Sequence, residues 1–396
     1  MIVGVPLESN PQERRVALVP ALVPILAKAG LEILVEKGAG EKAGFPDVAY
    51  EERGARIASD RRQLFSSADL LAQVHGPAAN HDGGQADLAL YRSGQVVVGL
   101  LNPLGAPQGA RQLAETGVTA FSLELLPRVS RAQSMDVLSS MASIAGYKAA
   151  ILAAGTLKKM YPMMITAAGT ITPARVFVVG AGVAGLQAIA TSRRLGALVQ
   201  SYDVRPAVKE QVESLGAKFL ELELETKGAE ASSGYAKVMG EDFYRRQREM
   251  MTQVVADSDV VITTAAIPGK KAPVLLTEEM VRGMRLGSVI VDLAAEGGGN
   301  CELTRPGETL EVHGVTILGP INLPSTVSYH ASQMYGKNVT TFLQNLVQKG
   351  AVLINRDDEI IRETLITHGG EVVNGRVREL LGLPATAPPT NERRRS

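Results

Sequence analysis

Residues 176–185, with the sequence VFVVGAGVAG, restrict the fold of this chain more than any other segment. An apolar run comes first, three glycines follow in the spacing G-x-G-x-x-G, and an amphipathic helical pattern begins after them. The first glycine permits a tight turn, the second lets a ligand approach the backbone, and the third lets the helix pack on the sheet. The segment therefore predicts a strand, a phosphate-binding turn and a helix, as in a dinucleotide-binding unit. A glycine turn without a ligand is the alternative.

An acidic residue follows the next predicted strand. That strand, residues 198–202, ends at Asp203, 18 residues after Gly185. A carboxylate there accepts hydrogen bonds from the adenosine ribose and repels a 2′-phosphate, which favours NAD(H) over NADP(H). Arg205 is a complication because a nearby arginine accommodates a 2′-phosphate, but Asp203 lies closer to the strand end. The alternative for Asp203 is a solvated turn residue.

Two further strand ends are expected at the same edge of the sheet, since ligands of such sheets lie beyond the carboxyl ends of the strands. These are residues 263–269 and the glycine-rich residues 292–299, although glycine runs also serve as plain turns. The nucleotide-binding residues predicted from these patterns are Gly180, Ala181, Gly182, Val183, Gly185, Asp203, Val204, Arg205, Thr264, Ala265 and Ala266.

Short β-branched runs alternate with helical patterns along most of the chain, which implies parallel sheets covered by helices on both faces. One series of strands is predicted at 2–5, 31–36, 70–74, 95–100 and 119–122, and a second at 176–179, 198–202, 260–264, 288–292 and 316–318. A long apolar helix at about 136–159 separates the series, and a helical stretch at 330–348 returns to the first.

We therefore predict an α/β protein with two Rossmann-like, doubly wound parallel-sheet domains joined by long helices. The 396 residues suffice for two domains of about 150 residues or more. The first domain is expected to be discontinuous, with residues 1–135 plus 325–396. The second domain, residues 136–324, would bind NAD(H).

Charge and cysteine content exclude several classes of protein. Basic and acidic residues number 41 each, so no net field draws the chain to nucleic acid or to a membrane surface. Cys301 is the only cysteine, which excludes an intramolecular disulfide and a cysteine-rich metal site, and no metal is expected. Apolar stretches such as 95–101 and 149–154 are shorter than the roughly 20 residues that cross a bilayer. We expect no membrane segment and no nucleic-acid partner.

Several segments resemble the NAD(H)-binding first domain, the soluble alpha subunit of the split-subunit form, of proton-translocating nicotinamide nucleotide transhydrogenases. The likeness covers nearly the whole chain up to about Asn345. The segment 128–136, RVSRAQSMD, distinguishes this family from the related alanine dehydrogenases. The other segments are 163–170, 180–191, 209–216, 234–237 and 265–270.

The resemblance implies direct hydride transfer between NADH bound here and NADP+ bound on a partner domain, coupled to proton translocation through a membrane domain. It also implies a homodimer. Its partners would be membrane-embedded transhydrogenase subunits and the NADP(H)-binding domain. The chain would then be cytoplasmic, attached peripherally to the inner membrane through those subunits.

By resemblance, Arg128, Gln133 and Asp136 form a catalytic loop beside the nicotinamides, with Ser139 close by. The spacing agrees, because residues 133, 136 and 139 share one side of a helix expected to begin near Ser134. An ordinary helix cap is the alternative, since Ser and Asp are favoured in a first turn. Gly234 and Tyr235 lie in a long polar insert, residues 221–248, and Tyr235 resembles a tyrosine of the family's mobile loop. An insert of that length is typical of a functional lid.

Two alternative functions remain open. An alanine dehydrogenase is one, because Arg15 matches the arginine that holds the substrate carboxylate in that family. However, its catalytic lysine falls at His75, more plausibly a structural histidine here, and its catalytic histidine at Asn102. Oxidation of an amino acid requires a proton acceptor, whereas hydride transfer between two nicotinamides requires only alignment. The other alternative is a non-catalytic NADH-binding module, which would support no hydride transfer.

Overall fold

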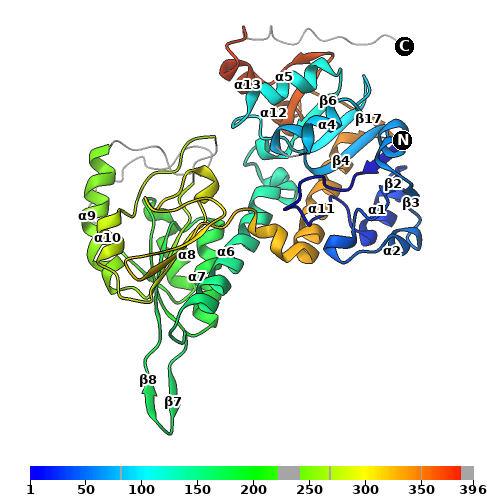
Figure 1. Ribbon diagram of the computed structural model, residues 1–396. Coiled ribbons are helices and arrows are strands. Elements are labelled where there is room, and N and C mark those ends of the chain that lie inside the picture. The colour runs from blue at the N-terminus through cyan, green and yellow to red at the C-terminus, as the bar shows by residue number, and fades with distance from the viewer. Residues whose placement is uncertain (81–82, 222–240, 267–268, 349, 385–396) are drawn as a thin grey trace. The chain divides into compact units, whose positions relative to one another are not determined.

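The computed structural model describes residues 1–80, 83–221, 241–266, 269–348 and 350–384. The chain divides into two compact units (Figure 1): unit 1 is Met1–Ser140 with Ser325–Ser396, and unit 2 is Met141–Pro324. The chain passes from unit 1 to unit 2 inside helix α6 (Val137–Thr156), a few residues beyond the boundary drawn from the sequence. The predicted discontinuity of the first domain is confirmed.

Unit 1 contains an eight-stranded sheet in the order β19-β18-β6-β5-β4-β1-β2-β3. Strands β1 to β6 are parallel, and their spatial order 3-2-1-4-5-6 is that of a doubly wound fold. The last two strands extend the sheet in antiparallel fashion. The strands are β1 Ile2–Val5, β2 Glu32–Glu36, β3 Arg56–Ala58, β4 Leu70–His75, β5 Val96–Leu100, β6 Thr119–Ser122, β18 Leu365–His368 and β19 Glu371–Val372.

Unit 2 contains a seven-stranded sheet in the order β11-β10-β9-β12-β13-β15-β14. Its parallel strands repeat the 3-2-1-4-5-6 order, and β14 closes one edge as an antiparallel strand. Both units are therefore of the predicted α/β class. The strands are β9 Arg175–Val179, β10 Leu198–Tyr202, β11 Lys218–Phe219, β12 Val260–Thr263, β13 Val289–Asp292, β14 Thr309–Val312 and β15 Val315–Leu318.

Helices connect the strands of both units. In unit 1 they are α1 Val23–Lys28, α2 Asp47–Glu51, α3 Arg61–Ser67, α4 Gly84–Leu88, α5 Pro107–Glu115, α11 Ser328–Leu346, α12 Glu359–Thr364 and α13 Gly375–Leu380. In unit 2 they are α7 Val183–Arg194, α8 Lys209–Ser214, α9 Glu241–Asp257 and α10 Glu278–Arg282. The 3₁₀ helices are η1 Pro20–Leu22, η2 Glu41–Ala43, η3 Pro77–Ala79, η4 Leu123–Leu125, η5 Ser130–Met135, η6 Pro206–Val208, η7 Ala295–Gly297 and η8 Leu323–Val327. Two small hairpins complete the fold: β7 Met164–Thr166 with β8 Gly169–Ile171, and β16 Val347–Gln348 with β17 Ala351–Val352.

Strand β9 shows why this sheet is central to unit 2. Val176 and Val178 belong to one apolar core, whereas Phe177 and Val179 belong to another on the opposite face. A strand covered on both faces is apolar at every position, which explains the uninterrupted run before the glycines. The turn that follows β9 is consequently anchored on a rigid, buried strand.

Helix α6 is long and apolar enough to cross a membrane by length and composition, and it is the one described helix that meets that test. The expectation that no stretch is long enough is therefore wrong for this helix. Core helices pass the same test, and Ala149, Ala150 and Ala153 of α6 are fully buried in the core of unit 2. The burial of these residues makes α6 weak evidence for a membrane span.

Candidate nucleotide-binding site

The glycine turn joins the end of β9 to the start of α7. Gly180 has a φ of 98°, a left-handed conformation that favours glycine. A Cβ at Gly180 would lie 2.4 Å from Oγ1 of Thr264, and one at Gly185 would lie 1.8 Å from the Gly180 carbonyl oxygen. The packing of the chain itself therefore requires glycine at both positions.

Gly182 differs from its two neighbours in the motif. Its φ of −75° is open to any residue. Among the described residues, a Cβ there would have only Nη2 of Arg205 within 4 Å, at 3.9 Å. The fold does not require glycine at this position. A glycine that packing does not need is expected where a pyrophosphate occupies the space of a side chain.

Helix α7 begins directly after Gly182 and offers donors to an anion. Its N-cap residue is Gly182, so no side chain caps the first turn. The first backbone N–H groups of a helix have no partner within the helix, and the helix dipole places partial positive charge there. Val183, the first residue of α7, is 38% exposed, so this end of the helix is accessible. The start of α7 thus has the donors and the access that a phosphate group requires.

Asp203 lies directly after β10, and its carboxylate already accepts four hydrogen bonds. Oδ2 accepts from the Ala181 backbone N–H at 2.7 Å and from Nη2 of Arg205 at 2.9 Å. Oδ1 accepts from the backbone N–H and the Nε of Arg205, at 2.8 and 2.9 Å. Val204, between the two, packs against the core beside β9. A carboxylate accepts about four hydrogen bonds, so a ribose hydroxyl must displace one of these donors.

The loop after β12 contacts the glycine turn. Thr264 donates from Oγ1 to the Gly180 carbonyl oxygen at 3.1 Å, which ties the two strand ends together. Ala265 is partly buried, and Ala266 is exposed at the end of the described part of this loop. The small side chains leave the backbone of residues 264–266 at the carboxyl edge of the sheet, as the sequence predicts.

Asn300 holds that loop in place, and sequence reasoning did not single it out. Its side chain is fully buried. Oδ1 accepts from the Ala265 backbone N–H at 3.0 Å, and Nδ2 donates to the carbonyl oxygens of Ala265 and Pro273, each at 2.8 Å. Asp292 in turn accepts the Asn300 backbone N–H at 2.7 Å. Its only signal in the sequence is its place at the end of the 297–299 glycine run.

In unit 1, the segment predicted to be catalytic is anchored by helices that come late in the sequence. Arg131 forms an ion pair with Asp358, and Asn338 donates from Nδ2 to the Ser134 carbonyl oxygen at 2.8 Å. Arg128 and Gln133 are exposed, and no described residue forms a hydrogen bond with the Gln133 side chain. Residues 130–135 form the 3₁₀ helix η5, so the α-helix begins at Val137 and not near Ser134.

Asp136 caps helix α6. Its Oδ1 accepts the Ser139 backbone N–H at 2.9 Å, and its Oδ2 accepts from the Ser139 hydroxyl at 2.5 Å. Both residues therefore have the structural role that the sequence offered as the alternative to catalysis. Capping leaves their part in catalysis a prediction. Gly234 and Tyr235 lie outside the described residues, as does most of the predicted lid.

A buried polar cluster in unit 1 contains the residues that suggested an alanine dehydrogenase. Arg15 pairs with Glu13 through Nη2 and Oε2 at 2.7 Å, and both side chains are almost fully buried. Burial lowers the pKa of His75 to about 4, so its ring is neutral at pH 7. Burial raises the pKa of Glu8 to about 8, and the charge of Glu13 adds to the shift.

His75 is less well satisfied than a structural histidine should be. Its Nδ1 is buried without a hydrogen bond, and the nearest carboxylate, Oε2 of Glu13, is 3.4 Å away. Asn102 has a left-handed backbone with a φ of 49°, and its backbone N–H donates to Glu124 at 2.9 Å. No base replaces the missing histidine at position 102.

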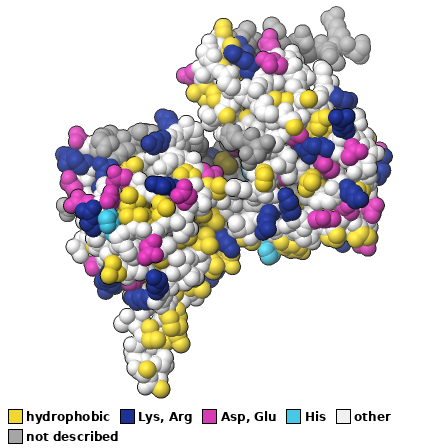
Figure 2. Space-filling model, viewed as in Figure 1, with side chains coloured by type: hydrophobic (Ala, Val, Ile, Leu, Met, Phe, Trp, Pro, Cys, Tyr) yellow, Lys and Arg dark blue, Asp and Glu magenta, His cyan; other side chains and the backbone are white. Residues whose placement is uncertain are grey.

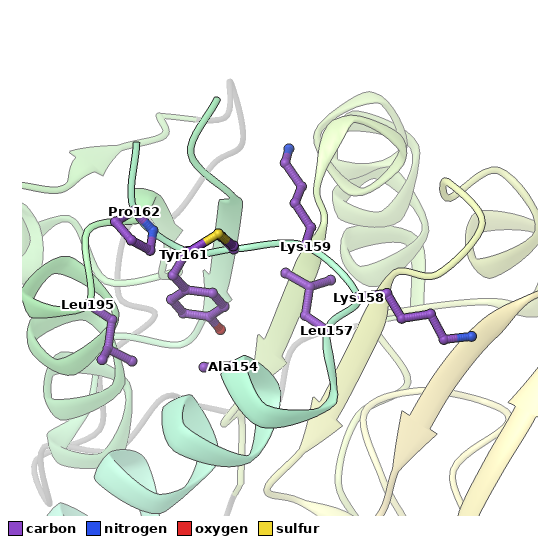
Figure 3. Close-up of a pocket in the computed structure, with 8 residues that line it drawn as sticks. Ala154, Leu157, Lys158, Lys159, Tyr161, Pro162 and Leu195 are labelled. Atoms are coloured by element: carbon purple, nitrogen blue, oxygen red, sulfur yellow. The ribbon is translucent and has the colours of Figure 1, made fainter. Parts of the chain in front are cut away.

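A cavity of about 470 Å³ lies at the other end of unit 2 from the glycine turn (Figure 3). Its walls come from the end of α6, the segment that follows it, and the end of α7. Tyr161, in this wall, accepts the Ala174 backbone N–H through its carbonyl oxygen, next to the first residue of β9. The glycine turn follows the last residue of β9, so this cavity is not the candidate nucleotide site. The lining residues are Ala154, Leu157, Lys158, Lys159, Met160, Tyr161, Pro162 and Leu195.

Comparison with known proteins gives consistent matches over both units. Residues 4–145 match the family "Alanine dehydrogenase/PNT, N-terminal domain", and residues 149–375 match "Alanine dehydrogenase/PNT, C-terminal domain". The chain is 47% identical over 377 residues to the first of the separate chains that make up NAD(P) transhydrogenase subunit alpha of Rhodospirillum rubrum, covering 94% of this chain and 98% of that protein. It is 32% identical to alanine dehydrogenase of Bacillus subtilis, covering 96% of this chain and 95% of that one.

Solved structures give the same relationship. A transhydrogenase from Sinorhizobium meliloti matches with a TM-score of 0.82 at 43% identity, covering 94% of this chain and 99% of that chain. An L-alanine dehydrogenase matches with a TM-score of 0.81 at 26% identity, covering 96% and 99%. The chain therefore belongs to the alanine dehydrogenase/PNT family, and it is more similar in sequence to these transhydrogenase alpha subunits than to these alanine dehydrogenases.

Proposed function

We propose that this chain is the NAD(H)-binding catalytic component of a proton-translocating nicotinamide nucleotide transhydrogenase. NADH bound at the turn between β9 and α7 is oxidised by direct hydride transfer, and NADP+ on a partner domain is reduced. The transfer needs no other reactant and no general base, only close alignment. The observation that carries the proposal is the open space over Gly182, which a pyrophosphate fills and which the fold leaves unexplained.

The residues of unit 2 have distinct tasks in this proposal. The first N–H groups of α7 bind the pyrophosphate, and Gly180, Gly182 and Gly185 shape the turn around it. Asp203 accepts hydrogen bonds from the adenosine ribose, with Ala181, Val204 and Arg205 around it. The loop of Thr264, Ala265 and Ala266 lies against the nicotinamide half, and Asn300 keeps that loop in position. Gly234 and Tyr235 would close over the bound nucleotide.

The residues of unit 1 would act in hydride transfer and not in binding NADH. Arg128 and Gln133 are exposed on a segment that is fixed to the C-terminal helices, which suits groups that meet a nucleotide carried by another protein. Asp136 and Ser139 hold the start of α6 directly behind them. A rigid support of this kind favours alignment to within about 1 Å, on which hydride transfer depends.

The proposed partners follow from the relatives' names. The most similar transhydrogenase relatives are named as one portion of a subunit alpha, which implies further subunits in those proteins. For this chain we propose membrane-embedded transhydrogenase subunits and an NADP(H)-binding domain as partners, a homodimer as its own assembly, and a cytoplasmic position held by those subunits.

The binding site is tested by replacing Gly182 with Val in the full chain. We expect the NADH dissociation constant to rise about tenfold or more, because the new side chain occupies the pyrophosphate position. Thermal unfolding should be unchanged, since the space is open. Gly375→Val is the matched control: Gly375 also begins a helix, has open space around it, and lies in unit 1. NADH affinity that is the same in Gly182→Val and in the unmodified chain would contradict the site.

The chemistry is tested separately. The chain is mixed with the NADP(H)-binding domain of a transhydrogenase, and reduction of an NAD analogue by NADPH is measured. Turnover supports the proposal. A chain that binds NADH but transfers no hydride with such a partner is a binding module, and the catalytic part of the proposal fails.

A further inference from the structure

Arg205 and Asp203 form a close, mostly buried ion pair at the edge of the candidate site. The guanidinium contacts both carboxylate oxygens, through Nε to Oδ1 and through Nη2 to Oδ2, each at 2.9 Å. The two side chains are only 13% and 6% exposed. Pairs with this two-pronged geometry are stronger than single contacts, and burial protects them from screening by salt.

The position of the guanidinium relates the pair to the glycine turn. Nη2 of Arg205 is the one described atom near the open space over Gly182, at 3.9 Å from an ideal Cβ there. The same carboxylate also accepts the Ala181 backbone N–H, within the turn. The cation therefore lies between the residue that reads the ribose and the space proposed for the pyrophosphate.

This arrangement affects NAD(H) and NADP(H) in opposite directions. A ribose hydroxyl can donate to Asp203 only if a donor of Arg205 leaves, so the pair weakens NAD(H) binding. A 2′-phosphate would meet a carboxylate whose charge is already balanced, beside a guanidinium whose planar donors suit phosphate. Among the described residues Arg205 is the only cationic partner of Asp203, and Lys209 on the next helix is paired with Glu221.

We propose that Arg205 is a specificity-determining residue that lowers the preference of this site for NAD(H) over NADP(H) by occupying and screening Asp203. The inference rests on the proposed function and goes beyond it. An acidic residue after the second strand normally indicates strong exclusion of the 2′-phosphate. With its carboxylate fully paired, Asp203 by itself does not give that exclusion.

The test measures dissociation constants of the full chain for NADH and NADPH by titration of nucleotide fluorescence. In Arg205→Ala, the ratio of the NADPH constant to the NADH constant should rise about tenfold or more, because NADPH binds more weakly and NADH equally or more tightly. Arg205→Lys keeps the charge and should stay within about threefold of the unmodified ratio. Arg282→Ala, which breaks an exposed pair with Glu278, is the control and should leave the ratio unchanged.

A second pair of variants shows whether Arg205 acts through Asp203. In an Asp203→Asn background, the further change Arg205→Ala should no longer raise the ratio. The proposal is overturned if Arg205→Ala leaves the ratio within about twofold of the unmodified value, or weakens both nucleotides equally, as a purely structural role would. Failure of the unmodified chain to bind either nucleotide would instead overturn the proposed function. Thermal unfolding of each variant identifies any that do not fold, and Arg205→Lys then decides.

Discussion

Single residues of the glycine motif are required for different physical reasons. Gly180 and Gly185 are fixed by contacts within the chain, at 2.4 and 1.8 Å from a hypothetical Cβ, whereas Gly182 faces open space. A sequence motif treats the three alike. Only the coordinates separate the glycine that a ligand needs from those that the fold needs.

Gln133 is the residue on which the catalytic proposal can be tested most directly. Its side chain is exposed and forms no hydrogen bond with a described residue, so Gln133→Ala should not alter stability. We expect hydride transfer to the partner-bound nucleotide to fall roughly 100-fold, the effect of a misalignment of about 1 Å. NADH affinity should stay within about twofold, because the glycine turn and Asp203 belong to unit 2.

The measurements for Gln133→Ala are NADH titration and single-turnover hydride transfer with the NADP(H)-binding partner. Ser134→Ala, at the adjacent exposed position, is the control, because Ser134 is held through its backbone carbonyl and not its side chain. Transfer at the unmodified rate in Gln133→Ala would remove the catalytic role assigned to residues 128–136.

Among the elements, the β7–β8 hairpin is the one whose surface the fold leaves uncovered. It extends away from the rest of unit 2, and apolar side chains gather on it (Figures 1 and 2). Met163 is 59% and Ile165 is 81% exposed, and residues 160–171 contain no charged side chain. An isolated two-stranded hairpin is marginally stable in water, so a covering surface would stabilise it. We propose that a second copy of the chain provides that surface.

Replacing Ile165 with Asp should therefore convert the proposed homodimer to a monomer. A charge buried at an apolar interface without a partner is strongly unfavourable. Sedimentation velocity is the measurement, and NADH affinity should be retained because the hairpin lies apart from the glycine turn. Leu286→Asp, at an equally exposed apolar position of unit 2, is the control. A monomeric unmodified chain, or a dimeric Ile165→Asp variant, would refute the hairpin as the dimer contact.

At the scale of the whole molecule, the fold does not distinguish the two activities found in the family. The transhydrogenase and alanine dehydrogenase structures match with TM-scores of 0.82 and 0.81. The side chains differ: His75 is neutral at pH 7 because burial lowers its pKa to about 4, and position 102 is an asparagine. Neither can supply the pair of groups expected in an amino-acid dehydrogenase.

We therefore expect no alanine dehydrogenase activity. A steady-state assay of the pure chain with NAD+ and L-alanine should stay well below about 1 s⁻¹, the lower end of ordinary enzyme turnover. The same preparation, active in hydride transfer with an NADP(H)-binding partner, is the positive control. Turnover on L-alanine at or above that rate would refute the transhydrogenase proposal.

The sequence by itself determined the elements whose signals are local. Strands at 2–5, 119–122 and 198–202 have the predicted bounds, since a strand buried on both faces is a continuous apolar run whatever its partners. The glycine turn was equally evident, because its chemistry is confined to ten residues. Strands β3 and β11, only three and two residues long, were not predicted. Segments so short become strands only through pairing with a neighbour.

Tertiary structure alone decided the features that depend on residues distant in sequence. Asn300 reaches the backbone of Ala265 across 35 positions, and Arg131 meets Asp358 across 227. The Asp203–Arg205 pair is close in sequence, yet only side-chain geometry shows that the carboxylate is occupied rather than open to a ribose. Periodicity records which face of an element is buried, because burial repeats along the element. It does not record which polar groups meet, because each such contact is made once and its partner can be anywhere in the chain.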